Sequence, residues 1–468
     1  MKKKCLIVVF ILILTIPFSV SYGQESPKGP VYVVQDGDSL WGIAQQFRVS
    51  MNELASINNI TNPNQLSAGM TLVIPGLEGI EGVLTTRTVN YGESLRSLSR
   101  LYQIPISLLA RLNHITNPGE IYAGYSLVVI EKEVISGYKK LLIAPSQSIL
   151  ELSVQNQINP WKLVYDNKLA GTWAGLSADP LLIFGGQTSQ PLALPEEITS
   201  VEISPLRLLQ GKPFISRIVA PEGCTISGQI MDSQLHFFLE KPGTYASIQG
   251  VHAMTEPGLY PLSLTFDIPG KGEYKFSQMV NIGSVDYPYD QPLTVDPTTI
   301  DPEITKPEEE LWRNLTIPFT EKKLWDGKFQ IPSSLSEAYC LETNDCWSSR
   351  FGNRRSYNGS TYSFFHTGLD IVGKNGDDIL APAAGIVVYT GTLTVRGNAT
   401  MIDHGWGIYT GYMHQSEILV NVGDQVEAGQ LIGRVGETGR VEGPHLHWEV
   451  WAGGVQVDPL DWLNNIYP

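Results

Sequence analysis

The chain is poor in cysteine, in histidine and in long apolar stretches. Its 468 residues include four cysteines, and no two of them show the C-x-x-C spacing that favours a structural zinc site. One apolar run stands out at residues 5–20, but it is short for a membrane span, and no other stretch is apolar enough to cross a bilayer. Basic residues are scarce, 32 against 47 acidic ones, for a net charge of −15. Such a surface repels nucleic acid and anionic membranes, which leaves neutral sugars and peptides as the easier partners.

The amino terminus has the pattern of a secretory signal peptide at residues 1–23. Lys2, Lys3 and Lys4 precede the apolar run, and small residues end it at Gly23. Cleavage after Gly23 would remove these three lysines and take the net charge from −15 to −18. We therefore expect a secreted or periplasmic protein with no integral membrane segment after cleavage. An uncleaved amino-terminal anchor is the alternative.

Export to an oxidising compartment would allow the cysteines that follow the leader to form a disulfide. Cys340 and Cys346 bracket a short polar loop, and export permits a disulfide between them. Cys224 is left over, so we expect it to be a buried apolar residue.

A repeated unit follows the leader. Residues 31–75 show the order strand, helix, helix, strand, and the same frame returns at residues 86–130. A third, degenerate copy is expected at residues 141–184, where Ser-Gln replaces Gly-Asp. One asparagine keeps its place in every copy: Asn58, Asn113 and Asn167.

Local signals inside the repeats mark helix starts. Ser50 and Glu53 have the spacing of a capping box, which predicts that a second helix opens there. In the second copy Pro105 stands at that place, and proline suits the first turn of a helix. The unit, with Asp-Gly-Asp-Ser-Leu at residues 36–40, resembles the LysM domain. That resemblance implies binding to N-acetylglucosamine glycans and hence to peptidoglycan. A purely structural spacer is the alternative, and glycan binding by the third copy stays open.

The pattern changes to strands at residues 195–283. Leu262, Leu264 and Phe266 alternate with polar residues, and turn sequences such as Lys-Pro-Gly at residues 241–243 separate the runs. This predicts an all-β, immunoglobulin-like sandwich that acts as a spacer.

Residues 284–334 are rich in proline and acid, and they predict a linker with a short helix around residues 308–315. We expect Trp312 or Trp325 to pack against the domain that follows, at residues 335–468. The acidic run is expected to face solvent.

Four of the eight histidines lie in three short motifs of this last domain. His366 is followed by Asp370, His414 stands alone, and His445 is followed by His447. Both outer motifs lie beside residues typical of strands, so the members of each pair are expected to share a face. Two such pairs on facing strands would converge on one metal ion. A catalytic zinc takes three protein ligands and keeps one position for water, and spacing alone leaves open which two of these groups stay off the metal.

The same segment resembles a known family. The three motifs, the Pro-Ala-Ala-Gly turn at residues 382–385 and the glycine-rich pattern of residues 422–433 are similar to those of the lysostaphin/LytM-type zinc endopeptidases. These enzymes cut peptidoglycan cross-links. The similarity covers about residues 351–463 and implies a mainly antiparallel β metallopeptidase domain.

The resemblance also implies a role for each polar group. It implies that one Zn2+ is held by His366, Asp370 and His447, and that His414 and His445 form the catalytic pair. None of these positions is substituted, which implies an active enzyme.

Further polar and aromatic residues lie near these motifs. The resemblance places His404 in a structural role. Glu442, Trp448 and Glu449 flank the site, where they could shape a substrate groove or hold a ligand histidine.

The sequence thus predicts a multidomain fold: small β-α-α-β LysM modules, an all-β immunoglobulin-like middle domain and a mainly antiparallel β metallopeptidase domain. The predicted function is that of a secreted, zinc-dependent endopeptidase that cuts peptide cross-links or bridges of the cell wall and is anchored to glycan. One alternative is a wall-bound, non-catalytic scaffold that activates an amidase. Another is a non-haem iron oxygenase, because two histidines and one carboxylate also form its facial triad. The bond that is cut stays open.

Overall fold

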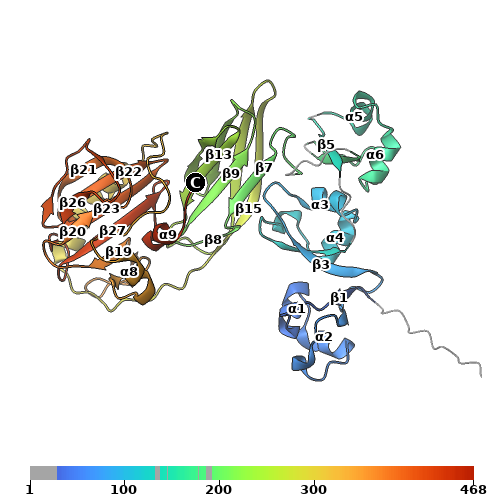
Figure 1. Ribbon diagram of the computed structural model, residues 1–468. Helices are drawn as coiled ribbons and strands as arrows, with labels where there is room; N and C mark the ends of the chain where they lie inside the picture. Colours follow the sequence, from blue (N-terminus) through green and yellow to red (C-terminus); the bar gives the residue numbers. More distant parts are fainter. Residues whose placement is uncertain (1–28, 132–136, 145, 178, 186–191) are drawn as a thin grey trace, which may run out of the picture. The chain divides into compact units, whose positions relative to one another are not determined.

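The computed structural model describes residues 29–131, 137–144, 146–177, 179–185 and 192–468 (Figure 1). The signal peptide expected at residues 1–23 lies outside this part of the chain. The described residues form two compact units, which are divided between Leu84 and Thr85. Within the described ranges, no helix is both long enough and apolar enough to span a membrane.

The first unit contains the first repeat. Its elements are β1 (Val31–Val33), α1 (Leu40–Phe47), α2 (Met51–Ile57), the 3-10 helix η1 (Pro63–Gln65) and β2 (Thr71–Val73). The strands β1 and β2 pair antiparallel, and the apolar face of α1 is buried. Ser39 caps α1, because its Oγ accepts the N–H of Gly42 at 3.1 Å.

The capping box predicted for α2 is wrong. Ser50 does occupy the N-cap with an extended backbone, but its side chain makes no capping hydrogen bond, and Glu53 is exposed. The first turn of α2 faces solvent, so water can satisfy its N–H groups without the serine hydroxyl. In the second repeat Pro105 lies at the N-cap of α4 (Ile106–Leu112), which confirms the helix start predicted there.

The second and third repeats follow, each with two helices. Their elements are β3 (Val83–Thr88), α3 (Leu95–Leu101), α4, η2 (Pro118–Glu120) and β4 (Ser126–Ile130), then β5 (Tyr138–Leu142), α5 (Ile149–Gln155), α6 (Pro160–Asp166) and β6 (Pro180–Phe184). The strands β5 and β6 pair antiparallel. The third copy therefore keeps the β-α-α-β order of the repeat, while its assignment to LysM remains a prediction.

One asparagine joins the second helix to the closing strand in each repeat. In the third repeat Asn167 Nδ2 donates to Leu163 O at 2.9 Å and to Leu182 O at 2.8 Å, and Asn167 Oδ1 accepts the N–H of Leu182 at 2.7 Å. Asn58 and Asn113 make the equivalent bonds in the first and second repeats. These paired bonds to two backbone segments explain why asparagine recurs where the surrounding sequence has changed.

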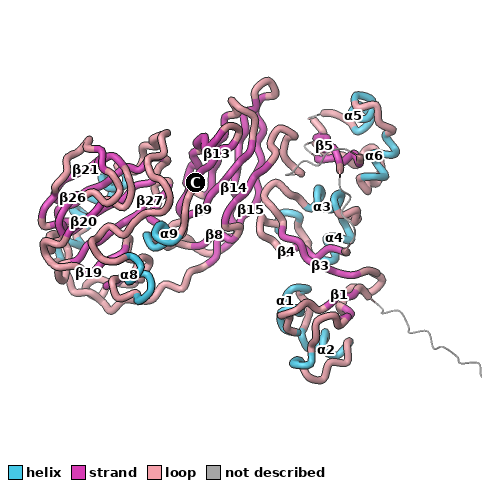
Figure 2. The backbone as a smooth tube through the Cα atoms, viewed as in Figure 1, coloured by secondary structure: helices cyan, strands magenta, loops and turns pink. Residues whose placement is uncertain are grey.

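Two β-sheets form the middle of the chain (Figure 2). One has the order β11-β10-β14-β15-β8 and the other the order β12-β13-β9-β7. Their strands are β7 (Ser200–Ser204), β8 (Arg207–Leu209), β9 (Pro213–Val219), β10 (Thr225–Ile230), β11 (Ser233–His236), β12 (Phe238–Lys241), β13 (Thr244–Gly250), β14 (Gly258–Ile268) and β15 (Gly272–Gly283).

Both sheets contribute to one apolar core. Leu262, Leu264 and Phe266 of β14 lie in it together with residues of the other sheet, whereas the polar residues between them are only partly buried. The predicted alternation of this strand is therefore confirmed, and the assignment to an immunoglobulin-like class stays a prediction. Cys224 is buried and unbridged, as expected.

An eight-stranded antiparallel sheet carries the three predicted motifs. Its order is β16-β19-β27-β23-β22-β21-β25, with β28 beside β27. The strands are β16 (Trp347–Ser349), β19 (Leu369–Val372), β21 (Gly385–Leu393), β22 (Gly397–Gly405), β23 (Ile408–Gln415), β25 (Gln425–Val426), β27 (His445–Ala452) and β28 (Val455–Val457). The mainly β architecture predicted for this domain is confirmed.

Smaller elements surround this sheet. They are η3 (Pro297–Ile300), α8 (Glu337–Thr343), β17 (Arg354–Arg355), β18 (Phe364–Phe365), β20 (Asp378–Leu380), β24 (Glu417–Ile418), β26 (Leu431–Arg434) and α9 (Pro459–Asn464). A disulfide joins Cys340 of α8 to Cys346, just before β16.

The predicted linker helix is longer than the sequence suggested. The helix α7 (Pro302–Asn314) begins with proline after the capping side chain of Asp301. Trp312 on this helix is fully buried, and Trp325 further along is buried as well. The expectation that the acidic run faces solvent is wrong for Glu308, which is buried because it pairs with Arg396 at 2.9 Å.

We predict that Trp312→Ala destabilises the carboxy-terminal domain by about 3–5 kcal/mol, because it removes a large buried ring and leaves a cavity. Leu311→Ala is the matched control on the same helix, since Leu311 is 38% exposed. Calorimetric unfolding of the full chain measures both variants. Equal shifts of the transition in the two variants would contradict the packing described for α7.

Candidate metal centre

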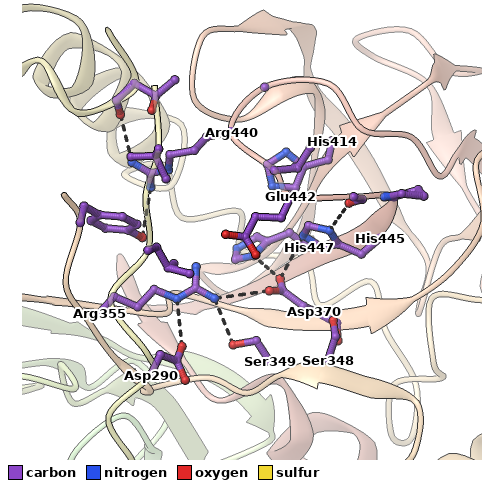
Figure 3. A pocket seen from close by; sticks show the side chains of 18 of the residues that line it. Asp290, Ser348, Ser349, Arg355, Asp370, His414, Arg440, Glu442, His445 and His447 are labelled. Atoms are coloured by element: carbon purple, nitrogen blue, oxygen red, sulfur yellow. Dashed lines mark hydrogen bonds and ion pairs between the residues drawn. The ribbon is translucent and has the colours of Figure 1, made fainter. Parts of the chain in front are cut away.

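Three polar atoms converge where β19 and β27 lie side by side. Asp370 lies directly opposite His447 in the register of the two strands. His366 precedes β19 and returns toward it: His366 Nε2 lies 2.9 Å from Asp370 Oδ1 and 2.9 Å from His447 Nδ1. His447 Nδ1 lies 2.7 Å from Asp370 Oδ1 (Figure 3 shows this contact). All three side chains are buried.

The strand geometry differs in one respect from the expectation. The sequence predicted two pairs of residues on facing strands, but β19 and β27 are hydrogen-bonded neighbours in one sheet. His366 lies outside the strands, in the turn before β19. This turn approaches β27 closely at Gly368, where a Cβ atom would lie 2.4 Å from Trp448 O and 2.7 Å from His447 Nε2. Glycine at this place therefore lets His366 reach the other two groups.

In each of the two histidines, the ring nitrogen that points away from the cluster has a hydrogen-bond partner. That partner determines which ring nitrogen carries the proton and which one carries the free lone pair. His366 Nδ1 lies 2.9 Å from Arg350 O, so its N–H donates there and Nε2 remains an acceptor. His447 Nε2 lies 3.5 Å from Glu449 Oε1, so this N–H donates to the carboxylate and Nδ1 remains an acceptor. Holding a ligand histidine through its other nitrogen is the usual arrangement around protein-bound metals.

This set of atoms fits a bound cation. Two imidazole nitrogens and one carboxylate oxygen lie within 4.8 Å of one another. Three acceptors brought this close repel one another unless a positive charge lies between them. The chemistry of the set, two neutral imidazoles and one carboxylate, suits zinc and also non-haem iron.

The protonation states agree with such a site. Burial lowers the pKa of His366 to about 4, which keeps its imidazole neutral at pH 7. Burial alone would raise the pKa of Asp370, but His366 and His447 bring it well below its ordinary value. Burial likewise lowers the pKa of His447, but hydrogen bonds to Asp370 and Glu449 outweigh this and raise it. The two carboxylates beside His447 therefore favour a proton on its Nδ1, and a bound cation would take the place of that proton and leave the imidazole neutral.

Two further imidazoles lie beside this cluster (Figure 3). His414 Nδ1 is 2.8 Å from Thr438 O, and His445 Nδ1 is 2.9 Å from Gly443 O. Both Nδ1–H groups therefore donate to backbone carbonyls, which leaves both Nε2 atoms as proton acceptors. The ring centroids are 5.0 Å apart, and His445 Nε2 lies 3.6 Å from Asp370 Oδ1.

His414 is held in an unusual conformation. Its φ of 65° lies in the left-handed region that non-glycine residues disfavour, and its N–H donates to Arg396 O at 2.9 Å. Burial, with smaller contributions from His447 and His445, lowers the pKa of His414 to about 3. The imidazole is therefore neutral at pH 7.

Glu449 is the centre of a buried network behind the cluster. Its carboxylate accepts hydrogen bonds from Thr367 Oγ1 at 2.6 Å, Trp312 Nε1 at 2.9 Å and Trp451 Nε1 at 2.8 Å. Burial would raise the pKa of Glu449, but the contact with His447 leads a group of interactions that lower it to about 2. The charged carboxylate thus joins α7, the turn before β19 and β27.

The cluster opens into a cavity of about 680 Å³. Its walls include Asp290 from the segment before α7, Arg355 of β17 and Arg440 of the loop before β27. Sequence reasoning missed these residues, because they lie outside the three motifs and no local pattern marks them. His404 is buried and does not line this cavity. Its Nδ1 contacts Ala384 O, and its Nε2 contacts Thr410 Oγ1.

The comparisons with known families agree with the two resemblances noted in the sequence. Residues 364–459 match Peptidase family M23, and residues 32–75 and 88–129 match the LysM domain. The chain therefore carries a lysostaphin/LytM-type M23 peptidase domain together with two LysM domains.

Curated relatives match one part of the chain. The chain is 39% identical to the Peptidoglycan DD-endopeptidase ShyA of Vibrio cholerae over 113 residues. These residues make up 24% of this chain and 26% of that protein. It is 41% identical over 95 residues to the DD-carboxypeptidase/endopeptidase Mpg of Neisseria meningitidis, covering 20% and 22%. It is 39% identical over 97 residues to the Murein hydrolase activator NlpD of Escherichia coli, covering 20% and 25%. The chain thus spans about a quarter of the length of these relatives.

We predict that Glu449→Gln weakens zinc binding by about 10- to 100-fold, the usual effect of removing the partner of a ligand histidine. The new amide cannot accept all the hydrogen bonds that the carboxylate accepts, and its NH2 group would face the indole N–H donors. Glu442→Gln is the matched control, since Glu442 is exposed at the cavity. Competition with a chelator measures zinc affinity in both variants. Equal affinities would show that Glu449 has no influence on His447.

Proposed function

We propose that this protein is a secreted zinc endopeptidase that hydrolyses peptide cross-links of peptidoglycan and is held on the glycan by its LysM domains. The observation that carries the proposal is the convergence of His366, Asp370 and His447 beside two imidazoles, His414 and His445, whose Nδ1 atoms are held by backbone carbonyls. The M23 match and the names of the endopeptidase relatives support the substrate class.

Each group in the cluster has a role in this proposal. His366 Nε2, Asp370 Oδ1 and His447 Nδ1 would hold the metal. Zinc, when bound, supplies a Lewis acid that polarises the amide carbonyl and lowers the pKa of a water molecule. Amide hydrolysis also needs a base that removes a proton from the attacking water and an acid that protonates the leaving nitrogen.

His414 and His445 are the proposed acid and base. Their Nδ1–H groups are held by backbone carbonyls, so each Nε2 is oriented to take up a proton. One Nε2 accepts the proton of the attacking water and passes it to the amide nitrogen as the C–N bond breaks. The products are a new carboxylate and a new amine, so the reaction consumes one water and leaves both histidines unchanged.

The amino-terminal repeats would localise the enzyme rather than take part in the chemistry. Two copies match LysM, and the third keeps the hydrogen bonds by which the recurring asparagine, here Asn167, joins the second helix to the closing strand. Several weak glycan contacts on one chain raise the apparent affinity through effective concentration. The two-sheet middle domain is the proposed immunoglobulin-like spacer.

A second candidate function is a scaffold that activates another wall hydrolase. The name of the Escherichia coli relative motivates it. The complete set of five polar groups favours catalysis, because a scaffold has no need of His414 and His445. The same two imidazoles, together with the LysM context, disfavour the iron oxygenase alternative, whose facial triad would leave them without a role.

We predict that metal binding and turnover separate by mutation. His447→Ala removes a ligand, so zinc content and activity fall together. His445→Ala leaves the three ligands in place, so zinc is retained while kcat falls by about 10²- to 10⁴-fold. Metal analysis and hydrolysis of a cross-linked peptide measure the two effects.

His114→Asn is the matched control, because His114 is exposed and has a φ of 52°, which asparagine tolerates. It should keep both zinc and activity. If His445→Ala lost its zinc while His447→Ala kept both properties, the assignment of ligand and catalytic histidines would be reversed.

A further inference from the structure

Arg440 lies on a loop that also positions a catalytic histidine. Thr438, two residues earlier, supplies the carbonyl that accepts the Nδ1–H of His414, and the N–H of Arg440 donates to Val395 O at 2.8 Å. A Cβ atom on Gly439 would lie 2.4 Å from the backbone N of residue 397, so the loop and the opposing turn are in close contact. These contacts fix the backbone of the loop, and the Arg440 side chain lines the cavity (Figure 3).

The guanidinium of Arg440 has only neutral partners among the described residues. Its Nη1 donates to Thr299 O at 3.0 Å and its Nη2 to the hydroxyl of Tyr357 at 3.4 Å. Its plane lies over the Tyr357 ring at 4.4 Å from the centroid. In the part of the chain that the structure describes, no carboxylate forms a salt bridge with Arg440, and its other N–H donors have no protein acceptor.

The neighbouring arginines differ in this respect. Arg355 lies 3.4 Å from Asp290 and 3.4 Å from Asp370, and Arg396 lies 2.9 Å from Glu308. Arg355 and Arg396 thus each form a salt bridge with a carboxylate of the protein, whereas Arg440 forms none among the described residues. Arg440 therefore places a guanidinium without a salt-bridge partner at the wall of the cavity.

Guanidinium groups with open N–H edges bind carboxylates through paired, charge-assisted hydrogen bonds. Acidic groups line the same cavity, including the exposed Glu442 and Asp296. These acids repel polyanions, so a single carboxylate carried by an otherwise neutral or amine-bearing peptide fits the cavity best.

We propose that Arg440 binds a free carboxylate of the substrate, so that the site selects peptides with a carboxylate close to the scissile amide over neutral chains such as polyglycine. This inference rests on the proposed endopeptidase function and specifies its substrate class. Arg440 is then a specificity residue, which binds the substrate beside the reacting atoms.

Two synthetic peptides test the inference, identical except that the residue next to the scissile amide carries either a carboxylate or a carboxamide. The zinc-loaded full chain should cleave the carboxylate peptide with a kcat/KM about 10- to 100-fold higher, as expected for a charge-assisted hydrogen bond. Arg440→Gln should bring this ratio close to 1, and Arg440→Lys should keep part of it. Lys306→Gln is the matched control, because it removes an exposed positive charge from the rim of the adjoining pocket and should keep the ratio.

A binding measurement separates this inference from the proposed function. Calorimetry with the His445→Ala protein measures the affinity for both peptides without turnover. If the full chain cleaves neither peptide, the endopeptidase proposal fails, and a calorimetric preference for the carboxylate that depends on Arg440 would still support the inference. Equal affinity for the two peptides, or a preference that survives in a folded Arg440→Gln variant, would overturn it.

Discussion

The pairing of β19 with β27 is the constraint on which the site depends. This register places Asp370 opposite His447 and, one step along, the fully buried Leu369 opposite Trp448. Successive side chains of a strand point to opposite faces, so a slip by one residue would exchange the polar pair for the apolar one. The burial of Leu369 and Trp448 in the apolar core therefore also fixes the position of Asp370 and His447, two of the proposed metal ligands.

A buried carboxylate extends this constraint to parts of the chain that are distant in sequence. Glu449 follows His447 on the same face of β27 and accepts hydrogen bonds from Trp312 of α7 and Thr367 of the turn before β19. The helix before the domain is thus part of the support of the site rather than a detached linker. The packing of α7 and the orientation of His447, a proposed metal ligand, thus depend on the same carboxylate.

The sequence predicted the elements with short-range signals and missed those that depend on long-range contacts. The motifs around His366, His414 and His445 were found because they hold four of the eight histidines, and because the residues beside the two outer motifs are typical of strands. The burial of Glu308 and the role of Arg440 were not found, because each depends on a partner brought near only by folding. The prediction of a capping box at Ser50 was wrong for a different reason. The local sequence signal is present, but the first turn of α2 faces solvent, so water can bind its N–H groups in place of the serine hydroxyl.

The proposed function requires that the chain itself cuts peptide bonds in the cell wall. Purified sacculi, incubated with the zinc-loaded full chain alone, test it most directly when the soluble products are analysed by mass spectrometry. We expect fragments with new amino and carboxyl ends within the peptide part and with intact glycan. Release that occurs only after an amidase is added, with no new peptide ends from the chain alone, would contradict it and identify the protein as an activator.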